Sequence, residues 1–102
     1  MPQARRRWGY YVLPILFGDR LVGRIEPRTE RRDGALRVVG LWFEDSFEPL
    51  AEPAFIPAFA AALRAHAEFG GVERIVLPRN ARHRPVVGAV SKLLGRDGRV
   101  RD

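Results

Sequence analysis

The chain has 102 residues, a length typical of one domain, and it contains no cysteine. Disulfides, thiolate metal sites and cysteine nucleophiles are therefore excluded. Apolar runs such as residues 10–17 and 58–63 are far shorter than the roughly 20 residues that a membrane-spanning helix needs. The basic start over residues 1–7 leads into no apolar core of the kind that a signal peptide carries. We therefore expect a cytoplasmic protein with no membrane partner.

Arginine dominates the charge of the chain. Eighteen basic residues against twelve acidic ones give a formal net charge of +6, and Lys92 is the single lysine among them. Residues 1–43 and 74–102 carry net charges of +5 and +6, whereas residues 44–73 carry −5. A fold that gathers both basic segments on one side would orient the molecule toward a polyanion. If the charges interleave in space, they cancel instead.

The first part of the chain predicts a pair of antiparallel strands. Residues 10–17 are rich in aromatic and branched side chains, which favour a strand. Pro14 cannot donate to a strand ladder, so we expect this strand at a sheet edge. A tight turn at Gly18 leads into a second strand over residues 20–26, and we expect Pro27 to end its pairing.

Residues 35–43 predict a third strand, joined to the second by a turn at Asp33-Gly34. Apolar side chains occupy both of its faces, with Leu36, Val38 and Trp42 on one and Val39, Leu41 and Phe43 on the other. A strand that is apolar on both faces is usually covered on both. The second face therefore needs a closed, barrel-like sheet, another part of this chain, or a partner.

Residues 53–69 predict the main helix, opened by Pro53 or Pro57 and ended by Gly70-Gly71. Its apolar stripe at helical spacing comprises Phe55, Phe59, Ala62, Leu63, His66 and Phe69. This stripe is the surface that we expect to pack against the sheet.

A short strand over residues 74–77 and a short second helix over residues 85–94 complete the predicted elements. The order is then β-β-β-α-β followed by α. We expect an α+β fold, in which a barrel-like antiparallel meander is packed by one main helix. Residues 1–7 form a basic arm, residues 8–94 a single domain and residues 95–102 a flexible tail.

Few side chains suit catalysis. The two histidines, His66 and His83, lie too far apart in sequence for a metal-binding pair, and His66 lies on the apolar stripe, which favours a packed role. The remaining candidates are the acids that follow the third strand, Glu44, Asp45, Glu48 and Glu52. Such a cluster can hold Mg²⁺ or supply an acid and a base, but it is more often a solvated connector. We expect no metal site and no cofactor.

Three groups of arginines are the candidate nucleic-acid contacts. They are Arg5, Arg6 and Arg7 in the N-terminal arm, Arg28, Arg31 and Arg32 near the turn at Asp33-Gly34, and Arg79, Arg82 and Arg84 after the fourth strand. Guanidinium groups present a planar fork of donors that matches phosphate oxygens. The alternative interpretation of each group is a solvated arm or turn that binds no ligand.

Residues 8–24, Trp-Gly-Tyr-Tyr-Val-Leu-Pro-Ile-Leu-Phe-Gly-Asp-Arg-Leu-Val-Gly-Arg, resemble part of a known family. The likeness is to the C-terminal portion of the winged-helix DNA-binding family that includes bacterial crosslink-repair DNA glycosylases, the YcaQ/AlkZ-like proteins. Residues 26–28 and 31–38 continue the match, and residues 71–74 fit the usual ending of the family. The resemblance covers about residues 8–77.

This resemblance implies duplex DNA as a partner. Members of the family are longer, carry tandem winged-helix units ahead of the matched region, and place a glutamine-containing catalytic motif there. The single glutamine of this chain, Gln3, lies outside the match, so no catalytic residue carries over. The resemblance thus implies a DNA-binding accessory module that contacts phosphates and has no catalytic residues of its own. It also implies, as a partner, an upstream winged-helix portion of a longer protein.

Two other functions remain open from the sequence. The apolar third strand could serve a protein-interaction or homodimerisation module. Glu44, Asp45 or Glu48 could serve a small hydrolase.

Overall fold

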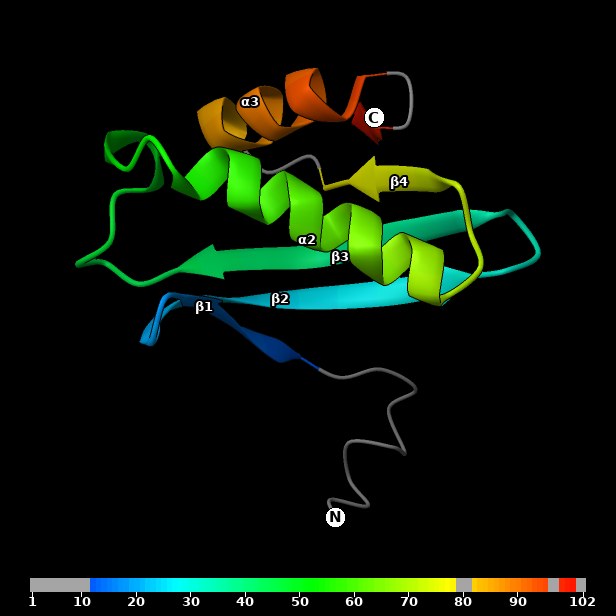
Figure 1. The fold of residues 1–102 in the computed structure, drawn as a ribbon, viewed down its shortest axis with the longest axis horizontal. Helices are drawn as coiled ribbons and strands as arrows, with labels where there is room; N and C mark the ends of the chain where they lie inside the picture. Colours follow the sequence, from blue (N-terminus) through cyan, green and yellow to red (C-terminus); the bar gives the residue numbers. More distant parts are fainter. Residues whose placement is uncertain (1–11, 79–81, 96–97, 101–102) are drawn as a thin grey trace, which may run out of the picture.

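The computed structural model describes residues 12–78, 82–95 and 98–100 and arranges them as a mixed sheet with two α-helices (Figure 1). The elements are β1 (Leu13–Phe17), β2 (Arg20–Glu30), β3 (Ala35–Phe43), the 3-10 helix η1 (Pro49–Ala51), α2 (Phe55–Phe69), β4 (Arg74–Leu77), α3 (Arg84–Leu94) and β5 (Gly98–Val100). β1, β2 and β3 form an antiparallel meander, while β4 and β5 add in parallel. The expected α+β class and second helix are confirmed, and the expected order of strands and α-helices is confirmed as far as α3, after which β5 follows.

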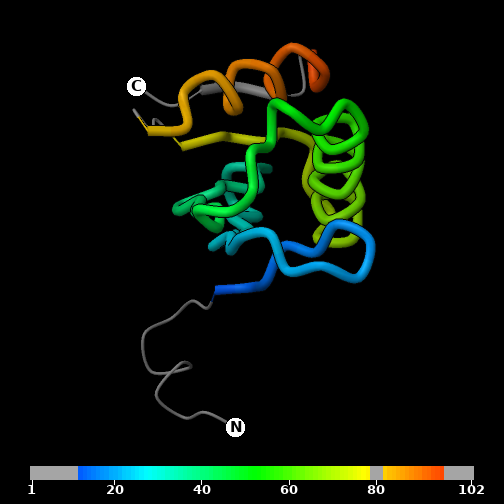
Figure 2. Tube along the Cα trace, turned by 90° about the vertical axis from the view of Figure 1, so that its left-hand side faces the viewer, coloured from blue at the N-terminus to red at the C-terminus, as the bar shows by residue number. Residues whose placement is uncertain are grey.

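The sheet is open rather than barrel-like, with the strand order β1-β2-β3-β4-β5. β1 forms one edge, as Pro14 predicts, because a residue without an N–H group is tolerated there. α2 lies across one face of the sheet, and α3 packs beside α2 and β5 (Figures 1 and 2). No described helix covers the other face, which we call the open face.

A β-bulge decides which side chains of β3 reach the core. Glu26 pairs with Gly40 and Pro27 with Val38, so Val39 has no partner on β2. The extra residue reverses which side chains of β3 face the core after the bulge. Leu41 is therefore buried on the same face as Leu36 and Val38. Trp42 faces away from α2 and is 48 % exposed. The predicted grouping of Trp42 with Leu36 and Val38 is therefore wrong.

The same bulge explains the length of β2. Pro27 does not end the pairing, as the sequence suggested, because it sits where the register shifts between Glu26 and Pro27. The ladder is already interrupted at a bulge, so a missing N–H group costs little there. β2 continues to Glu30, which pairs with Ala35 at the start of β3.

The face that α2 buries is rotated from the one that its sequence pattern predicted, toward Ala60 and Ala67. Its buried residues are Phe55, Phe59, Ala60, Leu63 and Ala67. Ala62 is exposed, His66 is half-buried, and Phe69 is 92 % exposed. Six residues correspond to about one and two-thirds helical turns, so Phe69 points away from the face that holds Leu63. Gly71, with φ +75°, adopts the left-handed conformation that ends a helix.

The C-terminal segment differs from the flexible tail expected for residues 95–102. Gly98–Val100 pair in parallel with β4 as β5. The predicted arm over residues 1–7, the start of the first predicted strand at residues 10–11, and residues 96–97 and 101–102 lie outside the described residues. Within the described ranges, no helix is both long and apolar enough to cross a lipid bilayer.

Candidate nucleic-acid interface

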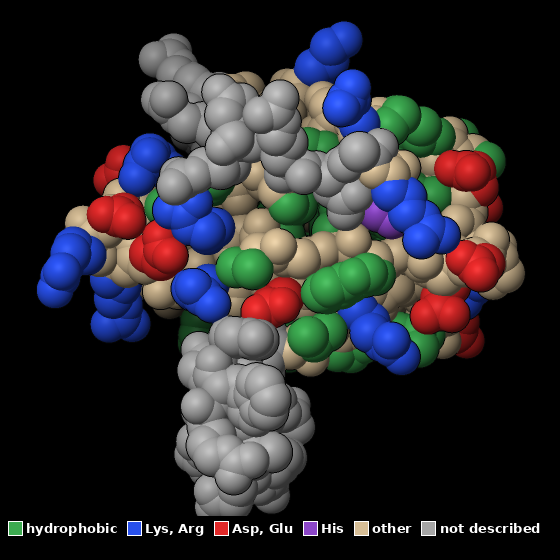
Figure 3. All heavy atoms as spheres, turned by 180° about the vertical axis from the view of Figure 1, so that it is seen from behind, with side chains coloured by type: hydrophobic (Ala, Val, Ile, Leu, Met, Phe, Trp, Pro, Cys, Tyr) green, Lys and Arg blue, Asp and Glu red, His purple; other side chains and the backbone are tan. Residues whose placement is uncertain are grey.

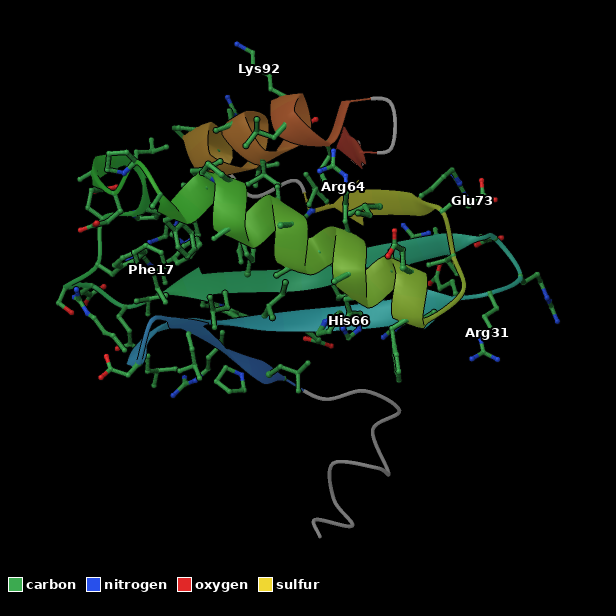
Figure 4. All side chains as sticks on the ribbon, viewed as in Figure 1. Phe17, Arg31, Arg64, His66, Glu73 and Lys92 are labelled. Carbon is green, nitrogen blue, oxygen red and sulfur yellow. The ribbon has the colours of Figure 1, made fainter. Side chains whose placement is uncertain are left out.

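The predicted arginine groups lie at opposite ends of the sheet. Arg28, Arg31 and Arg32 are exposed at the β2–β3 turn, and Figure 4 shows Arg31 at this end. Arg82 and Arg84 are exposed at the start of α3, near the C-terminal end of β3. The described arginines therefore do not gather at one end of the sheet. The remaining candidates, Arg5, Arg6, Arg7 and Arg79, lie outside the described residues.

Five guanidinium groups gather at the β2–β3 turn. We call this set the basic tip, and it comprises Arg28, Arg31, Arg32, Arg37 and Arg74. Arg28 on β2 and Arg37 on β3 are cross-strand partners, and Arg74 begins β4 beside Ala35. The same end holds three carboxylates, from Glu30, Asp33 and Glu73, and basic and acidic side chains mix there in Figure 3. Its net charge is therefore positive.

Two of these arginines are held by the protein itself. Arg37 donates from Nε and Nη2 to Oε1 of Glu30 at 3.1 and 2.9 Å. This hydrogen bond, together with the charges of Arg37 and Arg28, lowers the pKa of the Glu30 carboxyl. Arg74 donates to the backbone carbonyl of Asp33 at 2.6 Å. The side chains of Arg31 and Arg32 make no hydrogen bond or ion pair with the described residues, so their guanidinium donors face solvent.

Backbone hydrogen bonds fix the shape of the tip. The Gly34 amide donates to the carbonyl of Arg31 at 3.1 Å, and Gly34 adopts the left-handed conformation that such a turn requires. Its carbonyl accepts from the amides of Glu73 and Arg74 at 3.3 and 3.0 Å, which ties the hairpin to the start of β4. Arg31 and Arg32 are therefore presented from a braced turn.

The opposite end of the sheet, which we call the acidic end after Glu44, Asp45 and Glu48, also carries Arg20, Arg24, Arg82 and Arg84, so its charges largely cancel. Glu44, Asp45 and Glu48 line a groove of about 370 Å³ together with Arg82 and His83. Nη2 of Arg82 lies 3.4 Å from Oδ1 of Asp45, and both side chains are largely exposed. In the part of the chain that the structure describes, no three His, Asp or Glu side chains are grouped so as to hold a metal ion.

His83 packs against an aromatic ring in this groove. Its ring lies edge-on to Phe43, with centroids 5.1 Å apart. Burial, and then the charge of Arg82, lower the pKa of His83, while the charge of Glu48 opposes them. The folded protein therefore favours neutral His83, and this preference costs stability as the pH falls below the ordinary histidine value of about 6.5.

We expect an NMR titration to place the pKa of His83 below that ordinary value. Because the positive charge of Arg82 contributes to the lowering, Arg82→Ala should move the His83 midpoint upward. A wild-type midpoint at or above about 6.5 would contradict the packing of His83 against Phe43.

The open face carries a further feature at its acidic end. Trp42 on β3 is the cross-strand partner of Arg24 on β2, and both are exposed. They line a hollow of about 410 Å³ with Val12, Phe43, Glu44 and Asp45. Sequence reasoning missed Trp42 because the bulge at Val39 is not visible in the alternation of apolar residues.

No family model matches this chain, and no solved structure matches it. The features of the chain that bear on its function are the braced basic tip, the hollow beside Trp42 and the distribution of exposed apolar side chains.

Apolar side chains are also exposed away from these two sites. Leu16 on β1, which is 61 % exposed, lies opposite Leu21 on β2. Beside them an apolar groove of about 200 Å³ runs between β1 and α2, with His66 in its lining. His66 is half-buried among these apolar side chains.

Proposed function

We propose that this chain is a DNA-binding accessory module that contacts the phosphates of duplex DNA through the basic tip and carries no catalytic residue of its own. The observation that supports this most is the pair Arg31 and Arg32, exposed on a braced turn without partners among the described residues. The resemblance of residues 8–77 to a DNA-binding family favours DNA as the polyanion. It also implies an upstream winged-helix portion as the partner that would hold an active site.

The geometry of the tip favours phosphate rather than base recognition. Phosphate contacts position a protein on DNA without reading its sequence, and arginine forks are the usual donors for them. The acidic end, with Glu44, Asp45 and Glu48, lies at the other end of β3. Arg20, Arg24, Arg82 and Arg84 lie among these carboxylates, so the net positive charge of the described residues lies mainly at the basic tip. A molecule with its positive charge at one end approaches a polyanion with that end first.

A protein-interaction or homodimerisation module is the second candidate function. The apolar third strand supports it less than the sequence suggested, because the core buries Leu36, Val38 and Leu41. The exposed pair Leu16 and Leu21 beside the apolar groove favours it instead. Light scattering separates the two functions, since a stable dimer that is indifferent to DNA would support this second function.

A salt titration tests the DNA proposal. Each neutralised phosphate releases counterions, so log K for a duplex should fall linearly with log salt, by about 0.9 per contact. Two to five contacts from the basic tip predict a slope between about −2 and −4.5. Fluorescence anisotropy with a labelled duplex measures it. A flat dependence, or no binding at low salt, would reject the role in DNA contact.

A further inference from the structure

The indole of Trp42 lies along the open face rather than standing out from it. A Cβ atom built on Gly40 would sit 2.4 Å from Cη2 of Trp42 and 2.9 Å from Cζ2 and Cζ3. The outer ring therefore fills the space that a side chain at position 40 would take. Because Gly40 has none, the ring rests on the strand and keeps 48 % of the residue exposed.

The polar groups around Trp42 differ from those at the basic tip. Arg24 lies directly across on β2, and its side chain is exposed and makes no hydrogen bond or ion pair with the described residues. Glu44 and Asp45 line the other side of the same hollow. Their carboxylates would repel a phosphate, but they can accept hydrogen bonds from the N–H groups of a nucleobase.

An aromatic face beside a guanidinium is suited to an unpaired base. Bases stack on exposed aromatic rings whatever their sequence, and arginine adds a contact to the ring or to the flanking phosphate. Inside a uniform duplex the faces of a base are covered by its neighbours. Trp42 can therefore stack only with a base that has left the helix or that belongs to a single strand.

The basic tip and Trp42 lie on one continuous strand pair. Arg24 and Arg28 both occupy β2 and are four residues apart, which places their Cα atoms about 13 Å apart. Both face the same side, because an even separation along a strand keeps the face and the bulge lies on β3. Glu26 lies between them on the same side but is only 8 % exposed. A DNA strand whose phosphates contact Arg28, Arg31 and Arg32 can thus pass over it and reach Trp42 within a few nucleotides.

We propose that Trp42 and Arg24 hold an unpaired base of a DNA strand whose backbone is held by the basic tip. The indole stacks on the base, Arg24 contacts the base or its phosphate, and Glu44 and Asp45 accept from its N–H groups. The preferred substrate class is then DNA with an unpaired nucleotide rather than uniform duplex. This inference rests on the proposed function, and it names the substrate of that function more closely.

Two DNA probes test this inference: a fully paired duplex, and the same duplex with a short single-stranded gap. The wild type should bind the gapped probe more tightly. Trp42→Ala should weaken binding to the gapped probe by about 5- to 150-fold, the range expected for loss of one stacked base, and leave the paired duplex unchanged. Trp42→Phe, which keeps an aromatic face, should recover part of the loss.

The matched control is Phe69→Ala, which removes another exposed aromatic ring, at the end of α2. It should change binding to neither probe. In a Trp8→Phe background Trp42 is the only indole, so its fluorescence reports stacking directly. The gapped probe should quench this fluorescence, and the paired duplex should not.

The outcomes separate this inference from the proposed function. If the paired duplex binds with a steep salt dependence but Trp42→Ala weakens neither probe, or both equally, the base-stacking site is wrong and the phosphate contact stands. If Trp42 fluorescence is not quenched by the gapped probe, the site is also wrong. If neither probe binds at low salt, the proposed function itself has failed.

Discussion

Reversing the two free charges of the hairpin turn, in the double variant Arg31→Glu/Arg32→Glu, is expected to weaken binding to duplex DNA by about 60-fold at roughly 0.1 M salt. Both side chains are exposed and without partners among the described residues, so each is able to neutralise one phosphate. Loss of two contacts removes about 1.8 from the salt slope, which corresponds to that factor. Repulsion between the new carboxylates and the phosphates adds to the loss.

The control for this variant is Arg84→Glu/Lys92→Glu, which changes the net charge by the same amount. Arg84 begins α3 and Lys92 lies in its last turn, where Figure 4 shows it on the outer side of the helix, away from Arg31. We expect only a few-fold loss of affinity and an unchanged salt slope. Equal losses in the two double variants would mean that only net charge matters, and would reject the basic tip as the contact. Circular dichroism checks that both variants fold.

Local signals explain why the sequence predicted most of the elements. The bounds of β3 and β4 agree with the predicted strands because each is flanked by a strong turn or breaker, such as Gly34 before β3 and Pro78 after β4. Glycine in the left-handed conformation and proline act on the backbone at their own positions. Such signals need no knowledge of the rest of the fold.

Non-local pairing explains what the sequence did not reveal. The bulge at Val39 exists only because β2 and β3 pair in one register, and it moves Trp42 from the predicted core to the open face. The prediction that Phe69 packs against the sheet was wrong for a related reason. The face of α2 that the rest of the fold covers holds Ala60 and Ala67 but not Phe69. Periodicity shows that a stripe exists but not how far the neighbouring elements extend over it.

The topology also explains why the candidate site was only partly predictable. The helix α2 carries the chain back, so that β4 starts beside the β2–β3 turn and runs parallel to β3. Arg74, at the start of β4, therefore joins the basic tip, although it is distant from Arg28 in sequence. Arg82 and Arg84 follow the other end of β4 and lie at the acidic end instead. Of the five arginines of the basic tip, only Arg28, Arg31 and Arg32 could be grouped from the sequence alone, because they lie close to the turn in sequence.

The fold itself depends most on one side chain at the start of α2. Phe55 is 2 % exposed, and its ring lies between 5.1 and 5.7 Å, centroid to centroid, from four others. These rings belong to Phe17, Phe43, Phe47 and Phe59. They come from β1, from β3, from the segment between β3 and η1, and from α2 itself. Phe55 therefore joins four segments that are separate in sequence.

Phe55→Ala is expected to lower the free energy of unfolding by about 3–5 kcal/mol, because it removes a large buried side chain and leaves a cavity. The loss of the four aromatic pairs is part of this total. A domain of this size is stable by only about 5–15 kcal/mol, so the variant should be largely unfolded in moderate denaturant. Urea unfolding followed by circular dichroism gives the difference.

Phe69→Ala removes the same side chain from the other end of α2 and is the matched control. Since Phe69 is 92 % exposed, its loss should change the free energy of unfolding by no more than about 0.5 kcal/mol. Comparing the two variants separates the effect of burial on stability from the effect of helix propensity, because both substitutions place alanine in the same helix. Similar losses in the two variants would show that the aromatic cluster around Phe55 does not hold α2 on the sheet. A large loss at Phe69 alone would instead mean that its ring is covered in solution, as an interface between two copies would require.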